Sequence, residues 1–372
     1  MNDDACLPIL ALNAGSSSLK FGLYLVGFHT SRMLVSGAAE TADSGHIAFV
    51  AKDADGAVLA SDTRAGESPY AAIDRIAELL VEQRLPSIAA VGHRIVHGGP
   101  LCRHHTLIDA TVIAHLESAK IFAPLHVPPA LSLLQFAQRQ FPDAPQVACL
   151  DTAFHTTMPD VARTLPLPKT LRSQGIERYG FHGLSCESIV RQFGKSVPKR
   201  LVIAHLGHGA SVTAVANGQS VDTSMGLTPS GGVMMSTRCG DIDPGALAFV
   251  AREHDFNVAK LETLTNQQSG MLGVSGVSGD MRKLREAAAS NPDAALAIAM
   301  FCYSVKKQIA AMAAVLGGVD ALVFTGGIGE NDEAARTHIC EGLSNIVGQA
   351  PVHVMPAQED EQIALHTWHL AH

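Results

Sequence analysis

The order of apolar and polar positions predicts a chain in which strands and helices alternate. Continuous apolar runs over 8–15 and 18–26 predict two buried strands, and the short turn between them favours a hairpin. Spacing further along predicts a helix at 70–84, a strand at 89–99, helices near 109–119 and 129–140, and a strand at 146–151. The first half is therefore predicted to be mixed α/β.

The second half repeats this opening plan. Residues 200–224 predict an apolar strand, a glycine and serine turn, a second strand, and then the two-residue hairpin turn Asn217-Gly218. Later segments predict helices at about 245–254, 258–267, 281–289 and 293–316, then a strand, a glycine turn and a helix within 320–331. The echo of the first strands predicts an internal duplication.

A chain of 372 residues is too long for one ordinary hydrophobic core, so two domains are expected. The predicted fold class is α/β, with two duplicated domains whose mixed sheets are flanked by helices. We place the first domain at 1–150, joined by a C-terminal helix at 360–372, and the second at 151–359. Because each domain has a glycine turn at a strand end, we expect an active-site cleft between them.

Composition indicates a folded, cytoplasmic enzyme. Hydrophobic residues make up 47% and charged residues 17%, and the 33 glycines favour many tight turns. A net charge of -8 argues against a nucleic-acid or anionic-membrane partner, so an anionic substrate needs local Arg and Lys. Seven cysteines without a C-x-x-C pair indicate reduced thiols. The first residues lack a signal-peptide pattern, and the most apolar helical run is expected to be too short for a bilayer before Lys306 and Lys307.

The stretch LNAGSSSLKF, residues 12–21, is the first candidate for chemistry. A strand ends at Gly15 and three serines, and Lys20 follows in the next strand. Backbone N–H groups, hydroxyls and an ammonium near one turn suit phosphate oxygens. A plain hairpin with a solvated lysine is the alternative. The chain has no G-x-x-x-x-G-K-[ST] motif, so this is not a P-loop.

Arg94, in VGHRIVHGG, lies among apolar residues at the end of a predicted strand. A guanidinium held there suits a carboxylate or phosphate as a bidentate guest. His93 and His97 are four residues apart, but the glutamate of H-E-x-x-H is missing and a strand does not direct every fourth residue to one site. We interpret these two histidines as hydrogen-bonded packing residues.

Asp151 ends a predicted strand in CLDTAFH, and it is a candidate positioning or acid–base group, with a helix N-cap as the alternative. His155 and His182 lie in turn-rich sequence that can reach the same cleft. Arg238 is the cation of a long loop-like stretch over 222–245, and we expect it to point inward.

The turn HLGHGAS, residues 205–211, allows two interpretations. His205 and His208 stand three apart, as metal ligands sometimes do, whereas the glycines between and after them suit a phosphate-binding loop. Its likeness to NAGSSS favours the phosphate turn. Residues 275–282 and 324–331 provide two further turns, the second at a helix start where N–H groups favour anions. Together these features predict phosphoryl transfer, which depends on positioning and charge neutralisation.

The motifs LNAGSSSLKF, GHRIVHGG, PLHVPPAL, LDTAFH, RYGFHG, HLGHGAS, DTSMGLTP, MMSTRCGDIDPG, SGDMR and FTGGIGEN resemble, in this order, those of the acetate kinases. The resemblance covers nearly the whole chain. It implies two actin-like, ribonuclease H-like domains of the superfamily shared by sugar kinases, heat-shock chaperones and actin. It also implies reversible, ATP- and Mg²⁺-dependent phosphorylation of acetate to acetyl phosphate, with Mn²⁺ as a substitute metal, and a homodimer.

The resemblance implies a role for each matching residue. Catalysis is assigned to Asp151, His182 and Arg238. Binding of the carboxylate and its methyl group is assigned to Arg94, Val96, Leu125, Phe181 and Pro229. ATP binding is assigned to Lys20, His205, Leu206, Gly207, His208, Gly209, Asp280, Met281, Arg282, Gly327, Ile328, Gly329, Glu330 and Asn331. The metal is assigned to Asn13 and Glu359.

Elementary chemistry agrees with this implied reaction. A short carboxylic acid has a pKa near ~4 to 5 and is ionised at pH 7, so the attacking oxygen needs no general base. Asp151 is then better interpreted as orienting groups or metal than as a proton acceptor. Arg94, Arg238, Lys20 and Mg²⁺ must reduce the repulsion between the carboxylate and the γ-phosphate, and direct in-line transfer follows as the hypothesis.

The sequence departs from the family pattern in a few places. His208 stands where the family usually has Asn, and Ser236 where it has Gly. The stretch between Asn331 and VMPAQEDEQIA is shorter than usual, and Ala357-Gln358 replaces Thr-Asn or Thr-Asp, so the assignment of Glu359 depends on this alignment. A protonated imidazole beside ATP phosphates would bind them better, so His208 predicts a lower KM for ATP below about pH 6.5.

Three alternatives stay open at this point. One is a kinase for propionate or another short-chain carboxylate, because one methylene changes affinity by only about 1 to 3 kcal/mol. Another is an actin-like nucleotide-binding protein without catalysis, against which the presence of Arg94, Asp151, His182 and Arg238 argues. The third is a zinc enzyme.

Overall fold

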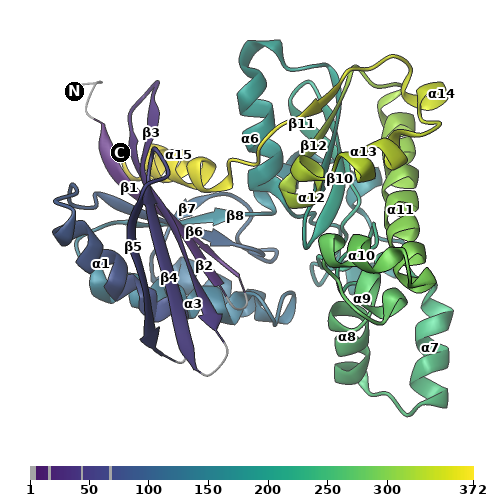
Figure 1. The fold of residues 1–372 in the computed structure, drawn as a ribbon, viewed down its shortest axis with the longest axis horizontal. Coiled ribbons are helices and arrows are strands. Elements are labelled where there is room, and N and C mark those ends of the chain that lie inside the picture. The colour runs from purple at the N-terminus through teal and green to yellow at the C-terminus, as the bar shows by residue number, and fades with distance from the viewer. Residues whose placement is uncertain (1–5, 16–17, 43–44, 67–68) are drawn as a thin grey trace. The chain divides into compact units, whose positions relative to one another are not determined.

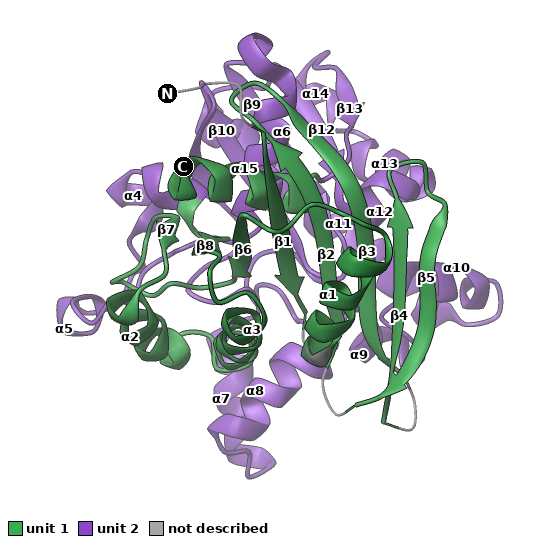
Figure 2. Ribbon diagram, turned by 90° about the vertical axis from the view of Figure 1, so that its left-hand side faces the viewer, with its two compact units in different colours: residues 1–153, 358–372 green, residues 154–357 purple. Residues whose placement is uncertain are grey.

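The computed structural model describes residues 6–15, 18–42, 45–66 and 69–372. Two compact units divide the chain (Figure 2): unit 1 is Met1–Ala153 with Gln358–His372, and unit 2 is Phe154–Ala357. The end of the chain therefore belongs to the same unit as its beginning. Each unit has its own sheet and its own covering helices (Figure 1).

Unit 1 contains an eight-stranded mixed sheet in the order β5-β4-β3-β2-β1-β6-β8-β7. Its strands are β1 (Leu7–Ala14), β2 (Ser18–Val26), β3 (Ser31–Ala42), β4 (His46–Asp53), β5 (Val58–Ala65), β6 (Ala90–Ile95), β7 (Thr106–Leu107) and β8 (Gln146–Leu150). The predicted β1–β2 hairpin is confirmed, and β6 and β8 continue the sheet in parallel to β1. The strand predicted to reach residue 99 ends at Ile95, before the glycines of VHGG.

Helices cover both faces of this sheet. They are η1 (Pro69–Ala71), α1 (Ala72–Glu82), α2 (Ala110–Ser118), η2 (Ala119–Ile121), α3 (Val127–Gln140) and α15 (Glu359–Ala371). Residues from α1 and α3 join the main core under β1 and β2, whereas α15 contacts β1, β6 and β8. Gly92 in β6 permits this contact, because a Cβ there would lie 2.1 Å from Thr367 Oγ1. The C-terminal helix thus lies directly on the strands that carry the candidate site.

Unit 2 contains a five-stranded mixed sheet in the order β11-β10-β9-β12-β13. Its strands are β9 (Arg200–Leu206), β10 (Ala210–Ala216), β11 (Gln219–Thr223), β12 (Ala321–Thr325) and β13 (Val352–Val354). Its helices are α4 (Asp160–Arg163), α5 (Lys169–Arg172), α6 (Gly183–Phe193), η4 (Gly194–Ser196), α7 (Pro244–Glu253), α8 (Val258–Gln267), α9 (Gly270–Ser275), α10 (Met281–Ala288), α11 (Pro292–Leu316), α12 (Gly326–Asn331), α13 (Glu333–Cys340) and α14 (Ser344–Val347). The segment η3 (Ala153–Thr157) leads from unit 1 into unit 2.

The two sheets share one topology. Strands β3-β2-β1-β6-β8 and strands β11-β10-β9-β12-β13 have the same order, with three antiparallel strands followed by two that are parallel to the central one. The predicted turn at Asn217-Gly218 is confirmed, with φ of 51° and 80° as a primed hairpin turn requires. The repeated sequence plan therefore corresponds to a repeated sheet, and the predicted α/β class with mixed sheets is confirmed.

Helix α11 is longer than its apolar run suggested. It continues through Lys306 and Lys307 to Leu316, and its 25 residues are long and apolar enough to cross a membrane by length and composition alone. One face of it, including Phe301 and Ile309, is buried inside unit 2. This burial is typical of the core helix of a globular unit.

Candidate active site

The β1–β2 hairpin brings two predicted residues of unit 1 opposite each other. Asn13 pairs with Lys20 in the strand register, and Asn13 is buried whereas Lys20 is exposed. Ser16 and Ser17, which belong to the predicted phosphate turn between the strands, lie outside the described residues. On the other side of β1, strand β6 carries Arg94 near its end.

Arg94 and Asp151 form a buried ion pair beside Asn13. Arg94 Nε and Nη2 donate to Asp151 Oδ2 at 2.9 and 2.5 Å, and Arg94 Nη1 donates to Asn13 Oδ1 at 3.1 Å. Burial alone would lower the pKa of Arg94, but the charges of Asp151 and Glu359 raise it overall. Burial raises the pKa of Asp151 even though Arg94 opposes this shift. The arginine is therefore a permanent cation, as its predicted role needs.

Asp151 is not a helix cap, because its carboxylate faces the arginine. Its second oxygen, Oδ1, is buried and has no hydrogen-bond partner among the described residues. A buried acceptor without a partner costs about 1–3 kcal/mol, so such an atom indicates a place for a further donor or a cation.

The start of helix α15 brings two acidic residues to the same cluster. Asn13 Nδ2 donates to Glu359 Oε2 at 3.3 Å and to Asp360 Oδ1 at 3.1 Å. Burial is the main cause that raises the pKa of Asp360, and the charge of Glu359 adds to it. Glu359 was predicted, but Asp360 was missed, although the acidic run after Gln358 was a visible signal. The cluster thus combines three carboxyl groups with Arg94, which favours a further cation.

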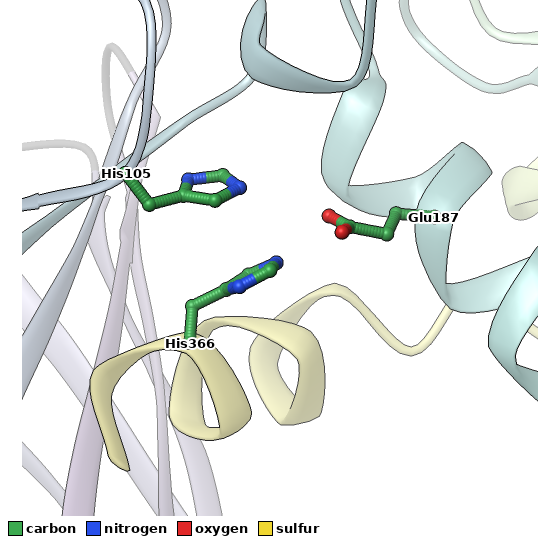
Figure 3. A group of neighbouring side chains, drawn as sticks. All are labelled: His105, Glu187 and His366. Carbon is green, nitrogen blue, oxygen red and sulfur yellow. The ribbon is translucent and has the colours of Figure 1, made fainter. Parts of the chain in front are cut away.

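Two histidines support the end of β8 within unit 1 (Figure 3). The rings of His105 and His366 stack with centroids 3.8 Å apart, and His105 Nδ1 accepts the N–H of Leu150 at 3.0 Å, just before Asp151. A metal-bound imidazole normally donates its other N–H to an acceptor, whereas this Nδ1 accepts one. We therefore interpret the pair of histidines as a packing contact. Glu187, which Figure 3 also labels, belongs to α6 of unit 2.

The other predicted residues of unit 1 differ in burial. Val96 is half-buried just after β6, whereas Leu125, predicted for an apolar pocket, is 50% exposed. His93 and His97 are packing residues as expected: His93 Nε2 bonds Gln146 Oε1 at 2.7 Å, and His97 Nδ1 accepts the N–H of Gly99 at 2.9 Å.

In unit 2, the β9–β10 hairpin organises three of the predicted residues. His205 lies opposite Ser211 in the register, and Gly207 and Gly209 close the turn between the strands through a bond of 2.9 Å. His182 Nδ1 bonds Ser211 Oγ at 2.9 Å. The rings of His182 and His205 stack with centroids 4.2 Å apart. His205 Nδ1 bonds Ser185 Oγ at 2.8 Å, and neither His205 nor His208 belongs to a group of three or more possible metal ligands among the described residues.

His182 has a strained backbone. It adopts a left-handed φ of 59° directly before helix α6, a conformation that costs a non-glycine residue about 1–3 kcal/mol. Its ring meets Arg238 at Gly209, where an added Cβ would lie 3.2 Å from His182 Nε2 and 3.4 Å from Arg238 Nη1. Arg238 Nη1 also donates to the carbonyl of Pro229 at 3.1 Å. His182 and Arg238 therefore converge on the glycine turn. Phe181, the neighbour of His182 in sequence, is buried.

The glycine turn after β12 is held by its own glutamate. Gly326 has φ of 78°, and a Cβ there would lie 2.8 Å from the carbonyl of Leu206, so only glycine fits. Glu330 Oε1 accepts the N–H of Gly326 at 2.9 Å and that of Ala357 at 3.0 Å. Asn331 Nδ2 donates to the carbonyl of Gly327 at 3.0 Å. Glu330 thus binds backbone within unit 2, and α12 includes the predicted Gly327, Ile328 and Gly329.

Asp280 caps helix α10. Its Oδ1 accepts the N–H of Arg282 at 2.8 Å and its Oδ2 accepts from Arg282 Nη2 at 2.8 Å, which lowers the pKa of Asp280 to about 2. Met281 is buried and the side chain of Arg282 is exposed. Asp280, which was predicted to contact the nucleotide, therefore caps the start of α10 in the structure.

His208 changes one prediction. The residue is exposed at the tip of its turn, but partial desolvation and then the charge of Arg238 lower the pKa of its imidazole from 6.5. The lowered pKa moves the expected onset of His208 protonation to a more acidic pH than the predicted 6.5. An effect of His208 protonation on ATP binding is therefore expected at that more acidic pH.

Glycine turns at strand ends, a buried arginine and a cluster of acidic residues in two α/β units are typical of a phosphotransferase. Residues 8–355 match the acetokinase family, and this chain belongs to that family. It is 41% identical over 350 residues to an acetate kinase of Brachyspira hyodysenteriae, covering 91% of this chain and 88% of that protein. It is 43% identical over 353 residues to an acetate kinase of Shewanella loihica, covering 90% and 86%.

Solved structures agree with this assignment. A propionate kinase from Francisella tularensis matches with a TM-score of 0.90 at 36% identity, covering 98% of this chain and 100% of that chain. An acetate kinase from Porphyromonas gingivalis matches with a TM-score of 0.85 at 34% identity, covering 98% and 100%.

Proposed function

We propose that this protein transfers the γ-phosphoryl group of ATP to acetate, reversibly, and gives acetyl phosphate and ADP. A carboxylate oxygen of acetate forms the new bond to the γ-phosphorus while the bond from that phosphorus to the β,γ-bridging oxygen breaks. The observation that carries the proposal is the buried cluster of Arg94, Asp151 and Asn13 beside the acidic start of α15. It provides a fixed cation for the acceptor carboxylate and oxygen ligands for a divalent ion.

In unit 1, Arg94 binds the acetate carboxylate and Asp151 holds the guanidinium in place. The two hydrogen bonds from Arg94 to Asp151 Oδ2 fix the plane of the guanidinium. The methyl group is assigned to Val96 and Leu125, together with Phe181 and Pro229 of unit 2.

The oxygen-rich cluster of unit 1 fits Mg²⁺, or Mn²⁺ as a substitute. Hard cations prefer carboxylate and amide oxygens, and the buried Oδ1 of Asp151, which has no hydrogen-bond partner among the described residues, suits such a cation. Asn13 and Glu359 would hold the ion, and Asp360 is a third candidate. When bound, the ion neutralises charge on the phosphate oxygens.

In unit 2, His182 and Arg238 stabilise the transferring phosphoryl group, and residues 205–209 line the phosphates. The convergence of both side chains on Gly209 supports this role. The remaining ATP contacts are assigned to Lys20, to 280–282 and to 327–331. We also propose that units 1 and 2 correspond to the two actin-like domains of the family.

Trapping the product with hydroxylamine tests the proposal. Purified protein with ATP, Mg²⁺ and acetate should produce acetyl hydroxamate, and omission of Mg²⁺ should abolish it. The same assay with zinc-selective chelation should leave the rate unchanged. If acetate, propionate and butyrate all give no ATP-dependent product, the proposed function is wrong.

Propionate is the second candidate substrate, because the chain closely matches the structure of a propionate kinase. One methylene in an apolar pocket changes specificity by about 10- to 200-fold. Comparison of kcat/KM for acetate and propionate decides between the two, and we expect acetate to be favoured.

We further propose a cytoplasmic homodimer. The residues of α7 and α8 include none that is buried. Phe249 of α7, Val258 of α8 and Ile242, just before α7, expose large apolar side chains. Such a surface on two neighbouring helices is typical of an interface. Light scattering should give twice the mass of the chain, and Phe249→Asp should shift it to one chain if α7 forms the contact.

A further inference from the structure

His155 is a buried histidine of unit 2 that the proposed reaction does not use. It lies in η3 and is 1% exposed. Its Nε2 bonds the carbonyl of Phe181 at 2.9 Å, and its Nδ1 bonds Ser220 Oγ at 2.8 Å. Both ring nitrogens are therefore engaged, one with the segment that contains His182 and one with strand β11.

The partners define the tautomer of His155. A carbonyl oxygen only accepts hydrogen bonds, so Nε2 must carry the proton and Nδ1 must accept from the Ser220 hydroxyl. Burial lowers the pKa of His155 to about 4, so the ring is neutral at neutral pH. The hydrogen bond that Nε2–H donates to the Phe181 carbonyl is therefore permanent at neutral pH.

This bond acts on the backbone of His182. The carbonyl of Phe181 and the N–H of His182 belong to one rigid peptide plane, and φ of His182 is the rotation about the bond that follows this plane. Holding the carbonyl therefore fixes one side of the left-handed φ of 59°. The ring also packs under Gly180, where a Cβ would lie 2.7 Å from His155 Cγ and Cδ2.

We propose that His155 is a positioning residue for His182, and that its bond to the Phe181 carbonyl maintains the strained backbone that directs the His182 ring to Gly209. A strained φ persists only where surrounding contacts hold it, and the His155 bond is the contact next to that residue. The expected loss of kcat rests on the proposed function. The expected displacement of the His182 ring does not.

A purely structural role for His155 would be to join η3 to β11. Thr157 provides a matched control for that role, because it lies in the same segment and its Oγ1 donates to the carbonyl of Ser220 at 2.8 Å. Replacing Thr157 by valine removes a bond between η3 and β11 without touching residues 180–182. It therefore separates loss of stability from loss of positioning.

The kinetic experiment compares His155→Leu, His155→Gln and Thr157→Val. We expect His155→Leu to lower kcat by about 10- to 100-fold while the KM values for ATP and acetate change less than about threefold, because a displaced His182 affects mainly the transition state. The amide N–H of His155→Gln can replace the Nε2 donor, so this variant should recover at least part of kcat. Thr157→Val should lower the melting temperature and keep kcat within about twofold.

A double variant tests whether the effect passes through His182. In a His182→Ala background, His155→Leu should change kcat by less than about twofold, because the group that it positions is gone. An undiminished effect of His155→Leu in that background would overturn the proposal. So would equal kcat values for His155→Gln and His155→Leu in natively folded preparations.

A readout without activity keeps this test separate from the proposed function. In protein labelled with ¹³C-histidine, the ring signal of His182, identified by its loss in His182→Ala, should move in His155→Leu and stay in Thr157→Val. If the protein makes no acetyl phosphate, the proposed function fails and this spectrum still decides the positioning role. If His155→Leu does not fold, His155→Phe, which removes the Nε2 donor and keeps a ring in place, is used instead; an unmoved His182 signal would then contradict the proposal.

Discussion

The β1–β2 hairpin of unit 1 and the β9–β10 hairpin of unit 2 occupy equivalent places in sheets of the same topology, yet they carry different polar groups. One residue before the end of β1 is Asn13, opposite Lys20, and one residue before the end of β9 is His205, opposite Ser211. Unit 1 thus uses an amide and an ammonium where unit 2 uses an imidazole and a hydroxyl.

The next strand shows the same contrast. Arg94 follows His93, the partner of Leu12 in the register, so it stands beside Asn13, and the residue of β12 that pairs with His205 is the fully buried Thr325. Buried charges must be paired, whereas neutral imidazoles need only hydrogen-bond partners. The shared topology therefore fixes where polar groups meet, and the residue types decide whether these strand ends carry charged or neutral groups.

The largest expected effect is on the charged site. Arg94→Ala leaves Asp151 buried without its cation, so the free energy of unfolding should fall by about 3–5 kcal/mol. Its kcat/KM for acetate should fall by about 10²- to 10³-fold. Arg75→Ala is the control, since Arg75 is a buried arginine of unit 1 paired with Asp62 and Glu82. The Arg75→Ala variant should lose stability but keep its turnover per folded molecule. If Arg94→Ala keeps its activity within tenfold of the parent protein, the charged-site assignment is wrong.

One glutamate from each unit gives the next comparison. Glu359→Gln removes a proposed metal ligand and should raise the Mg²⁺ concentration for half-maximal rate by about 10-fold or more. Glu330→Gln keeps the shape of a side chain whose Oε1 accepts the backbone N–H groups of Gly326 and Ala357 and, at 3.5 Å, the hydroxyl of Thr325. It should change Mg²⁺ dependence less than twofold and lower stability by about 1–2 kcal/mol. Equal Mg²⁺ dependence in both variants would contradict the distinction.

Acid should destabilise unit 2 more than unit 1. The pKa of His155 falls from 6.5 to about 4 on burial, so its stabilising contribution is complete above 6.5 and is lost as pH falls to about 4. The loss amounts to about 3 kcal/mol. His93 adds a similar loss in unit 1, where protonation of two carboxyl groups whose pKa values are raised by burial, Asp151 and Asp360, offsets it. In unit 2 the raised pKa of Asp222 gives such an offset from one carboxyl group.

Urea unfolding at pH 7 and pH 5 measures this difference. Trp368, the single tryptophan, is buried in unit 1 and reports that unit by fluorescence, while circular dichroism reports both. His155→Gln should flatten the pH dependence seen by circular dichroism. An unchanged slope in this variant would show that other groups cause the acid sensitivity.

The left-handed backbone of His182 predicts a smaller difference in stability, whose direction distinguishes glycine from alanine. Both His182→Gly and His182→Ala remove the ring and lower kcat, but only alanine retains a Cβ in the left-handed region, so the glycine variant should be about 1 kcal/mol more stable. At Arg191, inside α6, the order should reverse, with alanine about 1 kcal/mol more stable than glycine. Thermal unfolding of the four variants measures both differences; the same order at both positions would argue against strain at His182.

The smallest effect is expected at His208. Because its pKa is lowered, the ring is neutral at pH 7.5, and His208→Asn should change the KM for ATP by less than about twofold. Well below pH 6.5 the protein with histidine should bind ATP more tightly than the variant. Parallel KM profiles of the two proteins down to pH 5 would show that the substitution has no electrostatic role.

Strong periodicity and special turn residues made several elements predictable from the sequence. The β1–β2 hairpin, the Asn217-Gly218 turn and α8 lie where the spacing and turn residues predicted them. Strands β3, β4 and β5 were not predicted, because β4 and β5 are only partly buried and give a weaker apolar signal than a central strand. Helix α6 was also missed, because His182 precedes it in a left-handed conformation without a side-chain cap.

The contacts between the candidate residues, in contrast, depend on how distant elements pack together. Asn13 bonds Glu359 and Asp360 across more than 340 residues of chain, with separations of 346 and 347. Glu330 turns back to Gly326 and Ala357, and Asp151 faces Arg94 rather than capping a helix. Spacing along a chain reports which face of its own element a residue occupies. The partner that a buried charge finds depends on packing between elements, which local sequence does not encode.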